Sequence, residues 1–92
     1  MIRSFRCKET RRIYEGHKSK RFAAYQQAIE RKLQMLQSAV TLNDLRALPG
    51  TELEALDRDR KGQHSIRVNK QFRICFRWTP DGAEDIEFID YH

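Results

Sequence analysis

The sequence predicts an α+β fold in which N-terminal helices pack on one face of a small antiparallel β-sheet. Before Pro49-Gly50 the apolar residues recur at spacings of three and four, which is typical of amphipathic helices. After this dipeptide they alternate with polar residues, which is typical of half-buried strands. The chain has 92 residues and is 39% hydrophobic, which suits one small core. We therefore expect residues 1–92 to form a single domain.

The first half of the chain is expected to be helical, and its main helix is expected to act as scaffold. A short opening strand is expected at residues 2–5, and a polar, basic helix at residues 8–18. The main helix is expected at residues 22–40, with Thr41 capping a short helical turn after it. One apolar stripe runs along the main helix and consists of Phe22, Tyr25, Ile29, Leu33, Leu36 and Val40.

In the second half of the chain, strands are predicted at residues 53–56, 64–68, 72–78 and 83–89. A hairpin turning at Asn69-Lys70-Gln71 would place Val68 opposite Phe72, Ile66 opposite Ile74, and Arg67 opposite Arg73 on the other face. The next hairpin turns at Pro80-Asp81-Gly82. It would place Trp78 opposite Glu84, Arg77 opposite Asp85, Phe76 opposite Ile86, and Arg73 opposite Ile89.

The charge distribution indicates an acidic partner. The net charge is +5, and residues 1–21 alone hold eight basic and two acidic side chains, a net of +6. Residues 60–77 hold six basic side chains and no acidic one. Nucleic acid is the commonest partner of such basic segments. The alternative is a surface whose charge serves only solubility.

The arginine pair strengthens the nucleic-acid interpretation. Like charges directly opposite each other in a sheet are destabilising, and this register leaves Arg67 and Arg73 without an obvious carboxylate. Two guanidinium groups suit a phosphate, because their planar forks donate in pairs to its oxygens. The same register places Tyr91 diagonal to Arg73. Ordinary ion pairs with Asp85, Glu87 and Asp90 are the alternative.

The terminal Asp90-Tyr91-His92 is a candidate for proton transfer, because a phenol and an imidazole can each move a proton. Alternatively, Tyr91 covers the core and His92 is solvated. A metal site at His64, Asp90 and His92 has no local support, so no metal is expected. Cys7 and Cys75 match neither a zinc nor a redox spacing, and Cys75 is expected to be a free structural thiol.

The chain has no apolar run long enough for a membrane span, and its first ten residues, MIRSFRCKET, lack the apolar region of a signal peptide. A cytoplasmic protein without membrane partners is expected.

These features together resemble a known family. The run from Asp59-Arg60 to Trp78, which includes GQHSIRVNKQFRICFRW, is followed later by Asp90-Tyr91-His92, and this combination resembles HigB-type toxins of the RelE superfamily. These are toxins of bacterial toxin–antitoxin systems. The resemblance covers nearly the whole chain, including the opening residues MIRSF.

The resemblance implies a compact RelE-like toxin that enters the ribosomal A site and cleaves translated mRNA by attack of the 2′-OH. It implies no metal or other cofactor. The partners that it implies are the ribosome with its rRNA, mRNA, and a HigA-like helix-turn-helix antitoxin. The toxin would contact DNA only indirectly, through this antitoxin.

Residue by residue, the resemblance assigns catalysis to Arg67, Arg73, Asp90, Tyr91 and His92. With the basic segments, it indicates RNA or ribosome binding by Arg11, Arg12, Arg60, Lys61, His64 and Lys70. Some members carry a histidine and a lysine near the second strand, where this chain has Glu54 and Asp57. This departure leaves the acid and the base unassigned.

Two other function classes remain open at this point. ParE-like relatives keep the fold, inhibit DNA gyrase and lack the RNase residues, which this chain retains. A non-catalytic RNA-binding domain would need aromatic side chains on its polar face. Here Phe72, Phe76 and Trp78 all share the predicted core face.

Overall fold

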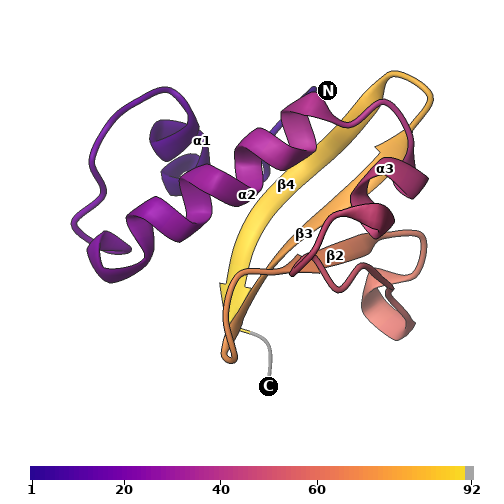
Figure 1. The fold of residues 1–92 in the computed structure, drawn as a ribbon. Coiled ribbons are helices and arrows are strands. Elements are labelled where there is room, and N and C mark those ends of the chain that lie inside the picture. Colours follow the sequence, from indigo (N-terminus) through magenta and orange to yellow (C-terminus); the bar gives the residue numbers. More distant parts are fainter. Residues whose placement is uncertain (91–92) are drawn as a thin grey trace.

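The structure is a computed structural model that describes residues 1–90. It consists of helices on one side of a four-stranded sheet (Figure 1). In chain order the elements are α1 (Lys8–Tyr14), η1 (Ala23–Tyr25), α2 (Gln26–Ser38), α3 (Leu42–Ala47), β1 (Glu54–Ala55), η2 (Arg58–Arg60), β2 (His64–Arg67), β3 (Phe72–Thr79) and β4 (Gly82–Asp90).

The sheet has the order β1-β2-β3-β4, and every neighbouring pair is antiparallel. Helix α2 crosses one face of the sheet, as Figure 1 shows. The α+β prediction is therefore confirmed. The strand expected at residues 53–56 is shorter than predicted, because only Glu54 and Ala55 pair with β2.

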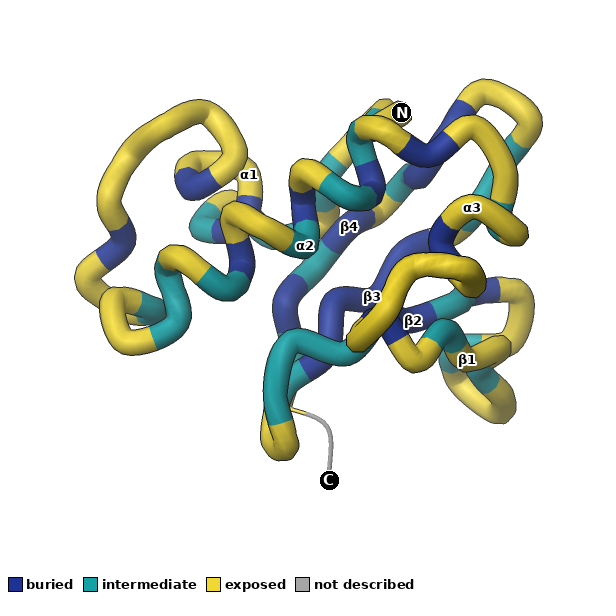
Figure 2. Tube along the Cα trace, in the orientation of Figure 1, coloured by how far each residue is buried: buried dark blue, intermediate teal, exposed yellow. Residues whose placement is uncertain are grey.

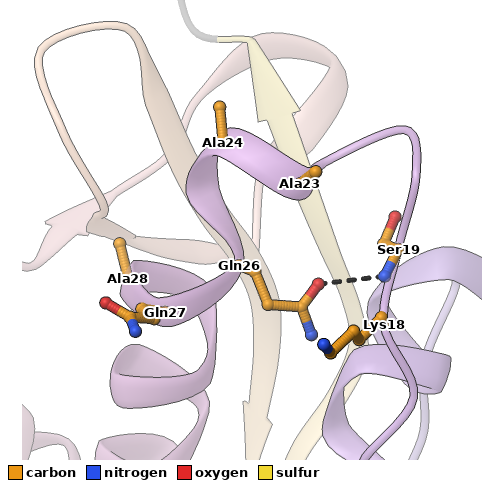
Figure 3. A pocket seen from close by; sticks show the side chains of 7 residues that line it. All are labelled: Lys18, Ser19, Ala23, Ala24, Gln26, Gln27 and Ala28. Carbon is orange, nitrogen blue, oxygen red and sulfur yellow. Dashed lines mark hydrogen bonds between the residues drawn. The ribbon is translucent and has the colours of Figure 1, made fainter.

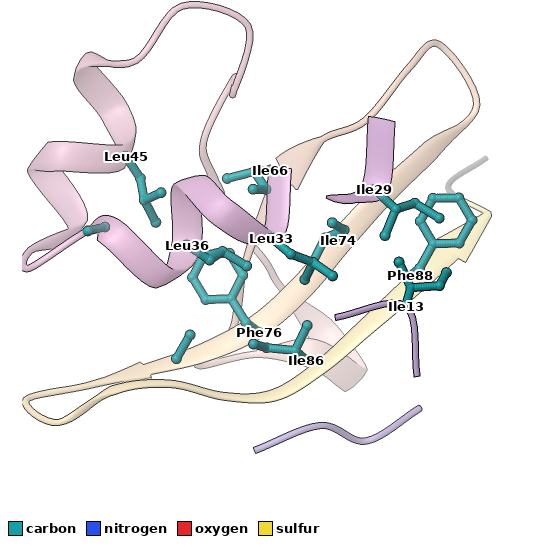
Figure 4. Packing of buried hydrophobic residues seen from close by; sticks show 12 residues of the cluster. Ile13, Ile29, Leu33, Leu36, Leu45, Ile66, Ile74, Phe76, Ile86 and Phe88 are labelled. Atoms are coloured by element: carbon teal, nitrogen blue, oxygen red, sulfur yellow. The ribbon is translucent and has the colours of Figure 1, made fainter. Parts of the chain in front are cut away.

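The core lies between α2 and the covered face of the sheet (Figures 2 and 4). The predicted stripe of α2 supplies Ile29, Leu33 and Leu36, each at most 1% exposed. From the strands and the other helices come Ile13, Leu45, Ile66, Ile74, Phe76, Ala83, Ile86 and Phe88. This burial of apolar surface holds the helical layer on the sheet.

Val40 does not belong to the stripe, contrary to the prediction, and is 79% exposed. Helix α2 ends at Ser38, and Ala39 is extended with ψ 134°. The N–H of Val40 then donates to the carboxylate of Asp44 at 2.8 Å. The change in backbone direction turns Val40 away from the core.

The other helix ends also follow local chemistry. Helix α1 ends at Tyr14, earlier than predicted, and Gly16 follows it with φ +97°. The predicted cap of α3 is confirmed: Thr41 Oγ1 accepts from the N–H of Asp44 at 3.2 Å, and the Asp44 carboxylate accepts from the N–H of Thr41. These backbone hydrogen bonds lower the pKa of Asp44.

The N-terminal segment covers the outer edge of β4. The strand expected at residues 2–5 forms only two isolated parallel bridges, from Ile2 to Ala83 and from Phe5 to Ile86. Between them Asp85 has φ +53° and donates its N–H to Ser4 Oγ at 3.0 Å. This irregular residue interrupts what would otherwise be a continuous ladder.

The predicted register of the β2–β3 hairpin is confirmed, with Ile66 paired to Ile74 and Arg67 to Arg73. The side chain of Asn69 shapes the turn. Its Oδ1 accepts from the N–H groups of Gln71 and Phe72, both at 2.8 Å. Such Asx interactions are a common means of closing a turn.

The β3–β4 register is confirmed at one end and wrong at the other. Arg73 does pair with Ile89. Near the turn, however, Trp78 pairs with Ala83 and Arg77 with Glu84, so Asp85 is not opposite Arg77. The turn is tighter than predicted, because Thr79 already pairs with Gly82, and a bulge between Cys75 and Arg77 restores the expected register.

Candidate active site

Arg67 and Arg73 lie side by side at the ends of β2 and β3. They are Cα partners across the ladder, and the next strand continues this row with Ile89. Strand β4 therefore ends, at Asp90, beside the arginine pair. The predicted row of Arg67, Arg73 and Ile89 is confirmed, whereas Tyr91, predicted to lie diagonal to Arg73, lies outside the described residues.

Arg67 presents the more accessible guanidinium of the two. Its side chain is 38% exposed, Nη1 lies 2.9 Å from Oε2 of Glu52, and Nε donates to the carbonyl of Asn69 at 3.1 Å. The expectation that Arg67 lacks a carboxylate is wrong. Its partner comes from fifteen residues earlier in the chain, outside the hairpins.

Arg73 is buried, with an exposure of 7%. Its Nε donates to Ser65 Oγ at 2.6 Å, and Nη2 donates to the carbonyls of Glu52 and Ser65. The carboxylate of Glu54 lies 3.8 Å from Nη1, so Arg73 also has an acidic neighbour, contrary to the prediction. These contacts make Arg73 the residue that ties β3 to the segment before β1.

The segment at residues 50–52 is fixed from several sides. Lys32 Nζ donates to the carbonyl of Gly50 at 3.1 Å, and the buried hydroxyl of Thr51 donates to the carbonyls of Leu45 and Leu48. The N–H of Arg67 donates to the carbonyl of Thr51 at 2.7 Å. Helix α2, helix α3 and strand β2 thus all hold the backbone that carries Glu52.

Lys32 belongs to the main helix, which the sequence predicts to be scaffold, and it is not part of the apolar stripe of that helix. It lies at the margin of this charged cluster. Burial lowers the pKa of Lys32, and the positive charges of Arg31 and Arg67 lower it further, whereas Glu52 raises it. Neither Lys32 nor Glu52 is marked by a local motif, and only the tertiary fold brings them near Arg67.

Arg60, expected to contact RNA, is paired inside the protein. Its Nη1 lies 2.7 Å from Oε1 of Glu87 and 3.2 Å from Oε1 of Gln63. The neighbouring Cys75 is a free thiol, as predicted, and is fully buried. Burial raises the pKa of Cys75 to about 11, so the thiol is not a nucleophile at neutral pH.

The remaining residues expected to bind RNA are dispersed. Lys61 and Lys70 are exposed, at opposite ends of the β2 region. His64 is half-buried and stacks on Phe76 with ring centroids 6.3 Å apart. Burial, and secondarily the charge of Arg46, lowers the pKa of His64, which favours the neutral ring. His64 is thus better placed for packing than for a phosphate contact.

Asp90 is exposed and accepts a hydrogen bond from Gln71 Nε2 at 3.2 Å. The other two predicted catalytic residues, Tyr91 and His92, lie outside the described residues.

The basic N-terminal segment retains exposed cations. Arg11 is exposed and pairs with Glu15 at 3.2 Å. Arg12, also exposed, lines a concave surface together with Glu9, Lys18, Lys20 and Arg21. A neighbouring depression contains Gln26, whose side-chain oxygen accepts from the N–H of Ser19 at 3.0 Å (Figure 3). That depression is lined mainly by alanine and uncharged polar side chains, and Lys18 is the one charged residue in its lining.

Among residues 1–90, no three histidine, cysteine or acidic side chains are grouped as a metal site would require. Within the same range, no helix has both the length and the apolar character needed to cross a membrane.

Comparisons with known proteins agree with the family resemblance. Residues 3–92 match the family model for the RelE-like toxin of the type II toxin–antitoxin system HigB. Toxin HigB-1 of Vibrio cholerae is 38% identical over 94 aligned positions, covering 100% of this chain and 98% of that protein. An uncharacterized protein of Haemophilus influenzae is 34% identical, covering 70% of this chain and 62% of the relative.

The fold is also similar to solved structures. Chains of the YoeB-YefM complex from Staphylococcus aureus match with a TM-score of 0.62, covering 100% of this chain and 98% of the solved chain. Their sequence identity is 17%, so this likeness concerns the fold. The family match gives no support to the gyrase-inhibitor alternative. The chain therefore belongs to the RelE-like HigB toxins of type II toxin–antitoxin systems, toxins that cleave mRNA and have an antitoxin partner.

Proposed function

We propose that this toxin is a ribosome-dependent endoribonuclease, which cleaves mRNA in the A site without a metal ion and thereby stops translation and growth. The single observation that carries the proposal is the accessible guanidinium of Arg67 beside the end of β4, within the run that resembles HigB. We further propose that residues 1–92 act as one domain in the cytoplasm.

The chemistry requires no cofactor. The 2′-oxygen of the RNA attacks the adjacent phosphorus, the bond from phosphorus to the 5′-oxygen breaks, and the products carry a 2′,3′-cyclic phosphate and a 5′-hydroxyl. One proton leaves the 2′-hydroxyl and one reaches the 5′-oxygen. The protein must therefore stabilise extra negative charge on the phosphoryl oxygens and exchange two protons.

Arg67 is the residue that we assign to the phosphoryl oxygens. A guanidinium donates two parallel hydrogen bonds to a phosphate and stays charged throughout the reaction. Arg73 is part of the same constellation, but its donors already hold Ser65 and the carbonyl of Glu52. We assign Arg73 to positioning, since its contacts fix the segment against which Arg67 is packed.

Proton transfer is assigned to the C-terminal residues. Asp90 is exposed beside the row of Arg67, Arg73 and Ile89. The proposal gives the protons to Tyr91 and His92, with Asp90 orienting one of them. An imidazole is suited to this task because its ordinary pKa lies near neutral pH.

Contacts with rRNA are assigned to the exposed cations, chiefly Arg12, Lys61 and Lys70. Such contacts to phosphates add affinity that falls with salt but carries no sequence information. A HigA-like helix-turn-helix protein is the antitoxin that we propose, and any contact with DNA would run through it.

Inducible expression in growing bacteria tests the proposal, with mRNA 5′ ends mapped and DNA supercoiling measured in the same cells. Wild type is expected to arrest growth and to create new 5′ ends inside translated reading frames. Arg67→Gln is expected to do neither at equal protein level. Growth arrest with intact mRNA and altered supercoiling would replace the proposal with gyrase inhibition.

A further inference from the structure

We propose that the carboxylate of Glu52 occupies the phosphate site of Arg67 while no RNA is bound, so that RNA binds by displacing this internal anion. The inference rests on the proposed function, because it concerns the same guanidinium. It assigns to Glu52 the role of a competitor that lowers the affinity of the toxin for free RNA.

The ion pair between Arg67 and Glu52 can separate at little cost in free energy. Nη1 of Arg67 and Oε2 of Glu52 are 2.9 Å apart, which is an ordinary charge-assisted hydrogen bond. Both side chains reach solvent, with exposures of 38% and 57%. Exposed ion pairs contribute little free energy, because water solvates the separated charges well. An incoming phosphate therefore meets only a small barrier to exchange.

The backbone of Glu52 does not need to move during this exchange. Its carbonyl accepts from the buried Arg73, and Thr51 before it is held by its hydroxyl and its carbonyl. The hydrogen bond between Glu52 and Arg67 is made by the exposed side chain of Glu52. A rotation of that side chain frees Nη1 of Arg67, while Nε still donates to the carbonyl of Asn69 and the positioning contacts of Arg73 stay in place.

The backbone conformation of Glu52 indicates that the surroundings impose this placement. Its backbone φ is +42°, which lies in a region that residues other than glycine and asparagine rarely adopt. Residues held there require support from neighbouring structure, and such residues are concentrated at functional sites. The contacts of Gly50 with Lys32, and of Thr51 with α3 and β2, supply this support.

The displacement model gives a physical reason for dependence on the ribosome. A tethered carboxylate competes at an effective concentration on the order of millimolar or higher. A free RNA strand must overcome this competition through few contacts. RNA already held in a decoding site loses less freedom on binding, and the basic N-terminal segment of the toxin adds rRNA contacts there. Glu52 raises the apparent Kd of both by the same factor, so it lowers the occupancy of weakly bound free RNA more than that of RNA held tightly on the ribosome.

Binding to a non-cleavable probe tests the inference without requiring activity. A fluorescent six-nucleotide RNA with 2′-O-methyl sugars is titrated with the full-length protein, and fluorescence anisotropy gives Kd. Glu52→Gln is expected to tighten binding about two- to fivefold, the factor that one exposed ion pair can supply. Glu52→Asn, which tolerates the positive φ, is expected to change Kd in the same direction.

The matched control is Glu30→Gln, which changes net charge equally. Glu30 lies on the exposed side of α2 and contacts Gln26. Its effect on Kd is expected to be below about 1.5-fold, because distant surface charges are screened. In an Arg67→Gln background, Glu52→Gln is expected to change nothing, since the displaced interaction is already gone.

Equal effects of Glu52→Gln and Glu30→Gln would overturn the inference, and so would weaker binding by both Glu52 variants. Failure of wild type and both variants to bind the probe would also overturn it. Failure of the proposed function has a different signature: no cleavage of ribosome-bound mRNA by wild type, whatever the Glu52 variants do to Kd.

Discussion

Arg67 and Arg73 face each other across β2 and β3, yet they differ in exposure and in the groups that they bind. The side chain of Arg67 is 38% exposed, whereas that of Arg73 is 9% exposed. Glu52 joins the two, because its carboxylate contacts Arg67 and its carbonyl accepts from Arg73. The repulsion expected between two opposed cations is thus offset from within the protein.

Arg73→Ala is expected to destabilise the fold, because it leaves Ser65 and the carbonyl of Glu52 without their buried donor. Loss of hydrogen bonds to a charged group costs about 1.5–3 kcal/mol each before relaxation. Urea unfolding measures this loss. Arg67→Gln, at an exposed side chain, is expected to unfold within about 1 kcal/mol of wild type. Equal stabilities for the two variants would argue against the positioning role of Arg73.

Two neighbouring arginines of the basic N-terminal segment are expected to contribute differently to ribosome binding. Arg12→Gln removes an exposed cation, whereas Arg11→Gln removes one already paired with Glu15. We expect Arg12→Gln to weaken ribosome binding more and to reduce its salt dependence by about one phosphate contact. Codon preference should be unchanged, because phosphate contacts carry no sequence information. A shift in the mapped cleavage sites would count against this assignment.

Stability is expected to depend on pH through His64. Its pKa lies below the ordinary value of 6.5, so the unfolded chain binds the proton more tightly than the folded protein does. The contribution of His64 to the free energy of unfolding is therefore fully present above pH 6.5. It is lost as the pH falls toward the lowered pKa of His64 in the folded protein. Urea unfolding at a series of pH values measures this profile. His64→Gln should flatten this part of it.

Cys75 is expected to resist alkylation in the native protein, because it is buried and its pKa is raised to about 11. Treatment with iodoacetamide at pH 8, followed by peptide mass spectrometry, measures this. Cys7 is half-buried and is expected to react first. Rapid modification of Cys75 without unfolding would show that the Arg60–Glu87 side of the sheet opens.

The sequence was sufficient to predict the helix-on-sheet layers and the opposition of Arg67 and Arg73. Alternating side chains and the short turn at Asn69 determine that register locally. The partner of Arg67 could not be predicted in this way, because Glu52 lies outside the hairpin and reaches Arg67 through a positive-φ backbone fixed by tertiary hydrogen bonds. The register at Pro80-Asp81 differs from the prediction because the turn is tighter, and a later bulge compensates for it.

Gly82 lies in close contact with the backbone of the N-terminal segment. A Cβ at Gly82 would lie 2.2 Å from the carbonyl oxygen of Met1, and φ is +131°. Gly82→Ala is therefore expected to cost about 1–3 kcal/mol through overpacking. Gly16→Ala is the matched control, because φ is +97° there and no atom lies within 4 Å of the added Cβ. Equal losses of thermal stability would contradict the close packing at Gly82.

Cleavage of a defined mRNA by the purified protein tests the central claim most directly. The mRNA is incubated with and without programmed ribosomes, in the presence of EDTA at a concentration that keeps ribosomes intact. Wild type is expected to cut only ribosome-bound mRNA, leaving a 2′,3′-cyclic phosphate, and Arg67→Gln to be about 10²–10³ slower. Intact mRNA with wild type, or equal rates for wild type and Arg67→Gln, would contradict the account.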